Sequence, residues 1–153
     1  MDDPHDLHRF VEAQADTYEQ ALAELKGGQK RTHWMWFIFP QFVGLASSAI
    51  SERFSIKSTE EATAYLAHSL LGPRLRRCSE AILQLDGQSA PEIFGTPDDL
   101  KLRSSMTLFA SVLSRGSIFE RVLTKYFAGA ADEATLRLLT PRPSFDDASS
   151  EQE

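Results

Sequence analysis

Apolar residues recur at helical spacing in successive segments of this chain, and capping or turn residues separate these segments. In the clearest segment, Leu102, Met106, Phe109 and Leu113 follow one another at intervals of four, three and four, directly after the helix-start sequence Thr96-Pro97-Asp98-Asp99. The alternation that a half-buried strand requires is almost absent. The pattern therefore predicts a mostly α protein, a single compact domain of about six or seven helices.

The helix boundaries follow from the same patterns. Ser58-Thr59-Glu60-Glu61 fits a capping box, in which Ser58 accepts from the backbone three residues on and Glu61 reaches back to the serine amide. Residues 44–57 look like a connection of small residues. The segments predicted as helices are 6–26, ending at Gly27-Gly28; 59–68; 71–85; 98–113; 118–127; and 132–140.

Composition limits the partners and the location of this protein. The chain has 153 residues, and the helical pattern predicts one domain over residues 1–140 and an acidic, serine-rich, disordered tail over 141–153. The tail carries half of the formal net charge of −6, and no basic cluster favours nucleic acid as a partner. No apolar run is long enough for a membrane span, and the acidic start does not resemble a signal peptide. We therefore expect a cytoplasmic protein; its oligomeric state is not predictable.

The run from His33 to Gln41 concentrates unusual residues in nine positions, namely both tryptophans of the chain, a histidine, a proline and a glutamine. A polar side chain that is buried without a hydrogen-bond partner lowers stability by ~1–3 kcal/mol. Core packing alone therefore does not explain polar residues inside such an apolar run. The run is therefore a candidate site. Short apolar runs cannot be assigned by periodicity, and helix and strand both remain open for it.

Cationic residues lead into this run and predict an anion site. Lys30 and Arg31 precede Trp34, and a helix N-terminus beside them would attract a phosphate or carboxylate, while Trp34 would stack on a planar ligand. His33 is the candidate catalytic residue, because an imidazole titrates near neutrality and can act as acid or base. The alternatives are that the two cations only solubilise the edge of a buried helix, that the tryptophan is core, and that His33 bonds a local carbonyl.

Further polar residues at apolar positions are candidate ligand contacts. Gln14 interrupts the apolar face of the first predicted helix and Gln41 follows Pro40; each amide would either contact a ligand edge or fasten two buried backbones. Lys101 and Ser105 lie one turn apart on a later predicted helix and would hold a phosphate or a ribose hydroxyl, or else Ser105 only permits close helix packing.

The remaining polar and sulfur-containing residues have structural explanations. Cys78, the single cysteine, occupies an inward position of its helix and is expected to be inert in the core. The acidic pairs Glu60-Glu61 and Asp98-Asp99 are explained as helix-start residues. No metal site and no cofactor are predicted.

Six groups of residues form motifs that follow one another in order along the chain. They are Phe10-Val11-Glu12-Ala13-Gln14; Lys30 with His33-Trp34-Met35-Trp36-Phe37-Ile38-Phe39-Pro40-Gln41; Glu61-Ala62 with Tyr65-Leu66; Leu71-Gly72 with Arg74-Leu75; Ile93-Phe94-Gly95; and Lys101-Leu102 with Ser104-Ser105-Met106-Thr107-Leu108-Phe109. These motifs resemble one bacterial family, the domain-of-unknown-function eighteen-ten family, over roughly residues 7 to 140. The resemblance implies a small, mostly α-helical single domain in which the aromatic run is helical, and it implies no established activity. Family members sometimes bear the label calpastatin, but a calpain inhibitor is expected to be a disordered repeat chain, whereas this sequence is periodic and core-forming.

A second, weaker pattern lies in the later helices and consists of Lys101, Phe109, Phe119, Leu123, Phe127, Gly129, Asp132 and Leu136. It resembles the closing part of the NADAR proteins, which are small helical N-glycosidases of ADP-ribose and riboflavin-precursor chemistry. The chain lacks the tryptophan-glycine and asparagine-leucine-glycine signatures expected after the similar segment.

Two classes of function follow from these patterns. In the first, the chain binds or hydrolyses a small anionic planar ligand, such as a nucleotide or an ADP-ribose derivative. In the second, it is a non-catalytic protein-interaction module whose aromatic motif is only core. The sequence does not decide whether it is an enzyme. The first class requires the heads of Lys30, His33, Trp34, Gln41, Lys101 and Ser105 to converge on one concave surface.

Overall fold

A computed structural model describes residues 3–140 of the chain. Over that range the backbone forms ten helices and no strand, with one isolated parallel bridge between Phe42 and Ile56. The helices are α1 (His8–Ala15), α2 (Tyr18–Lys26), α3 (Met35–Ile38), α4 (Ala49–Arg53), α5 (Thr59–Ala67), α6 (Leu71–Leu83), α7 (Ala90–Phe94), α8 (Asp98–Ser111), α9 (Ile118–Phe127) and α10 (Glu133–Leu139).

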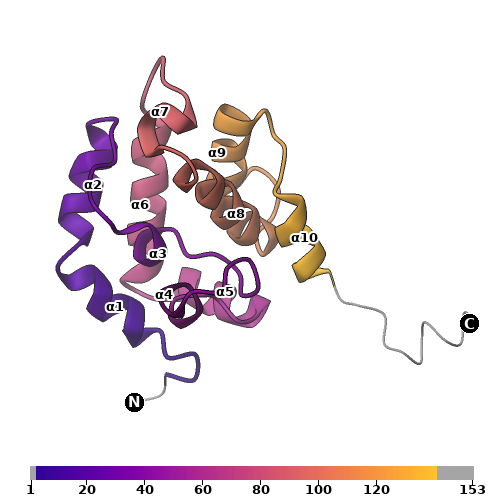
Figure 1. The fold of residues 1–153 in the computed structure, drawn as a ribbon. Coiled ribbons are helices and arrows are strands. Elements are labelled where there is room, and N and C mark those ends of the chain that lie inside the picture. Colours follow the sequence, from indigo (N-terminus) through magenta and orange to yellow (C-terminus); the bar gives the residue numbers. More distant parts are fainter. Residues whose placement is uncertain (1–2, 141–153) are drawn as a thin grey trace, which may run out of the picture.

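The two longest helices, α6 and α8, organise the core. Helix α6 packs against α2, α5 and α9, and α8 packs against α7, α9 and α10, as Figure 1 shows. A line of buried rings runs through the domain from α1 to α9: Phe10, Tyr65, Phe109 and Phe119 lie with successive centroids 5.1, 5.4 and 5.7 Å apart. Because this line joins four helices, the domain has one continuous core.

The mostly α, single-domain prediction is confirmed, but the expected count of six or seven helices is too low. The segment predicted as one helix over 6–26 is two helices, α1 and α2. The Thr17 hydroxyl donates to the Ala13 carbonyl at 2.7 Å, and the Thr17 amide donates to the Gln14 carbonyl rather than to the Ala13 carbonyl that a continuing helix would use. Back-bonding of this kind weakens and bends a helix, and the chain breaks here between α1 and α2. The predicted tail, 141–153, lies outside the described residues.

Two short helices, α4 and α7, were not predicted. Both begin with a serine cap: the Ser48 side chain accepts from the Ser51 amide, and Ser89 forms a complete capping box with Glu92. Each helix has five residues, which is too short for an apolar period to appear in the sequence.

The aromatic run is helical, as the family resemblance implies, but only for the single turn of α3. Phe39 ends that turn with φ −124° and ψ 75°, because the following Pro40 disfavours a helical conformation at the residue before it. Trp34, Met35, Ile38 and Phe39 are buried, and Trp36 and Phe37 are partly buried.

The predicted cap at Ser58 is present, since its side chain accepts from the Glu61 amide at 3.0 Å. The second half of the predicted capping box is wrong. The Glu61 carboxylate accepts from the Lys57 amide at 2.9 Å and from Arg9 at 2.7 Å, instead of reaching back to Ser58. The buried Arg9 guanidinium binds the Glu61 carboxylate, and a local sequence pattern cannot reveal a partner 52 residues away.

Gly72, at the second position of α6, permits a close contact with the end of α5. A Cβ atom added there would lie 2.1 Å from the Leu66 carbonyl oxygen, so the two helices would have to move apart. We expect Gly72→Ala to lower the free energy of unfolding by about 2 kcal/mol, measured by urea denaturation. Gly27→Ala is the matched control, because a Cβ at Gly27 meets its nearest atom at an ordinary 3.4 Å. Equal costs for both variants would contradict the steric explanation.

Candidate functional site

The loop between α2 and α3 carries Lys30, and two hydrogen bonds fix its first half. Gly28 has φ +79°, and its carbonyl accepts from the Gln88 side chain at 2.9 Å. The amide of Lys30 donates to the Ile93 carbonyl at 2.7 Å, which ties the loop to α7. The positive φ favours glycine at this position, and a Cβ there would lie 2.4 Å from the Gln88 amide oxygen, so the Gln88 side chain would have to shift.

Glu24 is the buried carboxylate that shapes this loop. It accepts from the Arg31 amide at 2.8 Å, from the Thr32 hydroxyl at 2.7 Å and from the Trp34 indole N–H at 2.8 Å. Burial raises the pKa of this carboxyl, but the hydrogen bonds from Thr32, Arg31, Gln20 and Trp34 outweigh it and hold the pKa at about 2. Glu24 is therefore charged at neutral pH and accepts the Trp34 indole N–H as a carboxylate.

The first turn of α8 faces this loop with two charged side chains, Asp98 and Lys101, which meet Lys30 of the loop. Asp98 Oδ2 lies 2.9 Å from Lys30 Nζ, and Asp98 Oδ1 lies 3.2 Å from Lys101 Nζ. The Lys30 side chain is only 8% exposed, whereas Lys101 and Asp98 are 27% and 20% exposed. One carboxylate thus bridges two ammonium groups that come from distant parts of the chain.

These groups and the aromatic run enclose a hollow of about 190 Å³, which we call the two-lysine hollow. Each ammonium also faces an indole: Lys30 Nζ lies 5.1 Å from the Trp34 ring centroid, and Lys101 Nζ lies 4.5 Å from the Trp36 centroid. Both distances are within the range of cation–π attraction. The lining residues are Lys30, His33, Trp34, Met35, Trp36, Phe37, Ile50, Asp98 and Lys101.

Four of the predicted site residues meet at this hollow, namely Lys30, His33, Trp34 and Lys101. Trp34 is 1% exposed and forms part of the wall deep in the protein, so the partly buried Trp36 offers more ring surface to a ligand. His33 is exposed at the rim rather than enclosed in an apolar pocket. Four of the six side chains that the ligand-binding class requires on one concave surface therefore line this hollow, and Gln41 and Ser105 do not.

The other three predicted ligand contacts do not line the hollow. The Gln14 side chain donates to the Phe37 carbonyl at 2.9 Å and to the Tyr65 hydroxyl at 3.1 Å, so it fastens α1 to α3 and α5. Gln41 is 6% exposed, and its carbonyl accepts from the Ile56 amide at 2.8 Å. Ser105 is fully buried, and its hydroxyl has no hydrogen-bond partner among residues 3–140.

Sequence reasoning overlooked Asp98 as part of the site. It was explained as a helix-start residue, and it does occupy the first turn of α8. Its spacing of three residues from Lys101 is the one local pattern that predicts the ion pair between them. Its contact with Lys30 depends on the tertiary fold and leaves no trace in the sequence.

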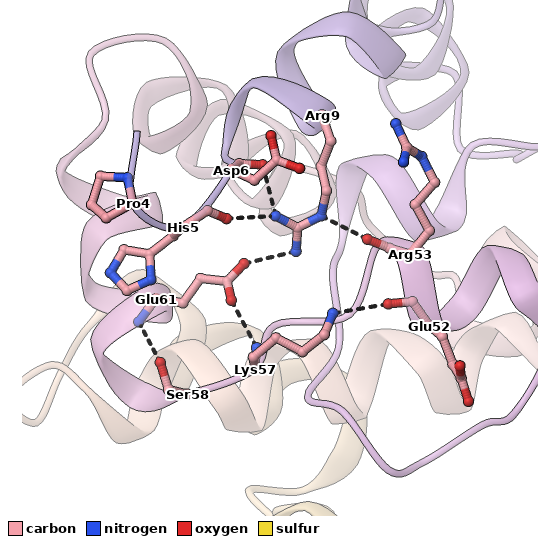
Figure 2. Close-up of a pocket in the computed structure, with 9 residues that line it drawn as sticks. All are labelled: Pro4, His5, Asp6, Arg9, Glu52, Arg53, Lys57, Ser58 and Glu61. Atoms are coloured by element: carbon pink, nitrogen blue, oxygen red, sulfur yellow. Dashed lines mark hydrogen bonds and ion pairs between the residues drawn. The ribbon is translucent and has the colours of Figure 1, made fainter. Parts of the chain in front are cut away.

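A second, larger hollow of about 480 Å³ lies where the N-terminal segment meets α4 and α5 (Figure 2). Its floor is the buried pair of Arg9 and Glu61, which are 7% and 2% exposed. Figure 2 shows the Arg9 guanidinium donating to the carbonyls of His5, Asp6 and Arg53 and to Glu61. A further bond to the Ser55 carbonyl completes five.

The Arg9 guanidinium has five N–H donors in all, so its partners in the protein account for its hydrogen-bonding capacity. The Lys57 ammonium, at the rim of the same hollow, likewise donates to the carbonyls of Glu52 and Ser55 and to the Ser55 hydroxyl. These groups join chain segments and leave little capacity for a ligand. We therefore treat this hollow as a structural junction.

Redox, metal and membrane features do not add a second candidate. Cys78 is fully buried, and burial raises the pKa of its thiol to about 12 despite the nearby Arg74 and Arg77. Within residues 3–140 no group of three or more His, Cys, Asp or Glu side chains is placed to hold a metal ion. In the same range, none of the helices combines the length and apolar character needed to cross a membrane.

The fold and the hollow define a small α-helical domain with paired cations facing two indoles. The chain belongs to the family described as "Protein of unknown function (DUF1810)", whose model matches residues 4–139. It is also similar to the conserved hypothetical protein Rv1873 from Mycobacterium tuberculosis, known from a crystal structure. The two are 53% identical with a TM-score of 0.89, and the match covers 92% of this chain and all of that one. A search of curated proteins finds no match.

Proposed function

We propose that this protein binds a small anionic ligand with a planar ring, such as a nucleotide or an ADP-ribose derivative, in the two-lysine hollow. The observation that carries the proposal is the convergence of the Lys30 and Lys101 ammonium groups beside two indoles. Ammonium groups bind phosphate as point charges, and indoles stack on planar rings with a gain of ~1–3 kcal/mol per ring.

The size and charge of the hollow narrow the choice of ligand. Its volume of about 190 Å³ is below the ~300–1,000 Å³ of sites that enclose drug-sized ligands. It therefore admits one ring or one anionic group, and the rest of a nucleotide lies outside. Two lysines against one aspartate leave a net positive charge among the described side chains of the lining. That charge favours an anion over a neutral or cationic ligand.

His33 keeps the role of candidate acid or base in this proposal, because it lines the hollow and an imidazole can both accept and donate a proton. Its place on the exposed rim puts it beside the part of a ligand that extends outward. We expect His33→Ala to retain ligand binding within about twofold, since a rim side chain contributes little. If the site also hydrolyses its ligand, turnover would fall much more than affinity in this variant.

Tryptophan fluorescence offers a direct binding assay, because the chain has two tryptophans and both line the hollow. We expect adenosine 5′-monophosphate to change this fluorescence in a saturable way, and Lys101→Ala to weaken its affinity at least ~10-fold. A hydrogen bond to a charged group contributes ~1.5–3 kcal/mol, which corresponds to that factor. Adenosine and inorganic phosphate, titrated separately, report the contributions of the ring and of the anion.

Lys26→Ala is the matched control, because Lys26 is exposed at the end of α2 and does not line the hollow. Its affinity for the nucleotide should equal that of the wild type. An affinity that stays unchanged in Lys101→Ala would refute the binding site. A saturable response to adenosine alone, with none added by phosphate, would refute the anionic part of the proposal.

A non-catalytic interaction module remains the second candidate. Among residues 3–140, four large apolar side chains are exposed, and one of them, Ile50 at 44%, lines the two-lysine hollow. The others are Leu100, Leu136 and Leu138, at 50%, 41% and 42%. If no small anion binds, a partner surface that covers Ile50 and Trp36 becomes the better explanation of the hollow.

A further inference from the structure

The Asp98 carboxylate bridges the two ammonium groups of the hollow with one oxygen each. Oδ2 contacts Lys30 Nζ at 2.9 Å, and Oδ1 contacts Lys101 Nζ at 3.2 Å. Asp98 is the only acidic residue that lines the hollow within the described part of the chain. Its carboxylate thus lies where the anionic group of a bound ligand would make the same two contacts.

We infer that Asp98 is an internal competitor for the anion of the ligand, and that binding displaces its carboxylate from Lys30 and Lys101. This inference rests on the proposed function. The affinity of the site for its ligand then depends on how much more strongly the ligand anion interacts with the two amines than the Asp98 carboxylate does. Asp98 sets that affinity and selects which anions can bind.

Lys30 explains why an anion must be present between the amines. Its side chain is 8% exposed, and a nearly buried ammonium without a counter-charge is strongly unfavourable. In the free protein Asp98 supplies that charge. A ligand anion that replaces Asp98 keeps Lys30 paired throughout, so the exchange does not leave a buried charge alone.

The position of Asp98 lets it leave at low cost. Its side chain is 20% exposed, and among residues 3–140 its carboxylate contacts no other basic group than these two amines. It lies in the first turn of the 14-residue helix α8, where a carboxylate interacts favourably with the helix dipole even after turning towards solvent. The other acidic residue of that turn, Asp99, is buried and does not line the hollow.

The competition predicts selectivity for phosphate monoesters over carboxylates. A phosphate monoester carries close to two charges at neutral pH and has three acceptor oxygens, so it can bridge both amines and exceed the single charge of Asp98. A ligand carboxylate only matches Asp98 and gains little from the exchange. The substrate class of the site is therefore a phosphate monoester attached to a planar group.

The test is the nucleotide affinity of Asp98→Asn, which retains the shape and an acceptor oxygen but loses the charge. We expect adenosine 5′-monophosphate, followed by tryptophan fluorescence, to bind Asp98→Asn at least ~10-fold more tightly than the wild type. Asp98→Glu, which retains the charge, should bind within about threefold of the wild type. Equal or weaker binding to Asp98→Asn would overturn the inference.

Thermal unfolding is a second measurement in case the substitution weakens the fold by leaving Lys30 without its counter-charge. Inorganic phosphate should then raise the Tm of Asp98→Asn by more than it raises the Tm of the wild type, at matched ionic strength. An equal rise in both proteins would contradict the competition.

The two proposals fail in different ways. Binding to the wild type that depends on Lys101 but does not tighten in Asp98→Asn would overturn the competition alone. No binding to either protein would overturn the proposed function, and the competition with it. Tight binding that appears only in Asp98→Asn would support the competition and would mean that Asp98 keeps the site closed to this nucleotide.

Discussion

Arg9→Met is expected to lower the free energy of unfolding by about 3–5 kcal/mol, the largest effect that we predict for a single substitution. The change leaves Glu61, which is 2% exposed, without its cationic partner. It also removes the donor to the carbonyls of Arg53 and Ser55 and so separates α1 from the segment after α4. Urea denaturation followed by circular dichroism measures this loss.

Arg53→Met is the control for that experiment. Arg53 lines the same hollow, but its side chain is exposed, and its loss should change the free energy of unfolding by no more than about 0.5 kcal/mol. Combining Arg9→Met with Glu61→Gln should cost less than the sum of the two single variants, because the double variant has no unpaired buried charge. An Arg9→Met protein as stable as Arg53→Met would show that the buried pair does not hold these segments together.

The role of Arg9 illustrates what sequence patterns cannot supply. It lies on α1 beside the apolar residues Phe10 and Val11, where an arginine is typical of the solvent-facing side of an amphipathic helix. Its main partners, Arg53, Ser55 and Glu61, are more than forty residues away. The same distance explains the error at Glu61, whose capping role was predicted from neighbours alone.

Local chemistry predicted well where one side chain determines the outcome. The cap at Ser58 is where the sequence places it, and α8 begins at the predicted Asp98 although no side chain caps its start. The capping box at Ser89–Glu92 was equally visible, but α7 was missed because it has no apolar period beyond its five residues. The break at Thr17 was missed for the opposite reason, since the apolar period continues through it while a side-chain hydrogen bond weakens and bends the helix there.

The sequence likewise predicted some residues of the candidate site, whereas the role of others follows only from the structure. Lys30 and Lys101 were selected for their charge and position, and the structure places both at one hollow. Gln14 was selected because an amide interrupted an apolar face, and that pattern fits either a ligand contact or a buried fastening. Its hydrogen bonds to the Phe37 carbonyl and the Tyr65 hydroxyl show that it connects buried segments of the chain. Residue type identified side chains that need an explanation beyond core packing. Only the fold shows whether such a side chain lines a hollow or connects helices.

Glu24→Gln is the second substitution with a large expected effect, about 3 kcal/mol at pH 7. The folded protein holds the pKa of Glu24 at about 2, against an ordinary 4.5, because the hydrogen bonds of its loop outweigh burial. Each pKa unit corresponds to ~1.4 kcal/mol of preference for the charged form. The amide in Glu24→Gln retains the shape but not the charge, and urea denaturation at pH 7 measures the loss.

The pH dependence of this loss separates charge from shape. Because folding lowers the pKa of Glu24, its contribution is fully present above about pH 4.5 and disappears as the pH falls towards 2. The difference in unfolding free energy between wild type and Glu24→Gln should therefore shrink between pH 7 and about pH 3. All other carboxyl groups are common to both proteins and cancel in the difference. A difference that stays constant over this range would mean that shape, not charge, explains the loss.

Glu24 also connects the stability of the loop to the two-lysine hollow. Its carboxylate accepts the Trp34 indole N–H at 2.8 Å, and Lys30 Nζ lies 5.1 Å from the centre of the same ring. Glu24→Ala removes this acceptor, whereas Glu24→Gln can keep it with its amide oxygen. The tryptophan emission of folded Glu24→Ala should therefore shift from that of the wild type, and that of Glu24→Gln should shift less. Identical emission in all three proteins would show that Trp34 is held by packing alone, and that Glu24 stabilises the loop without orienting the ring.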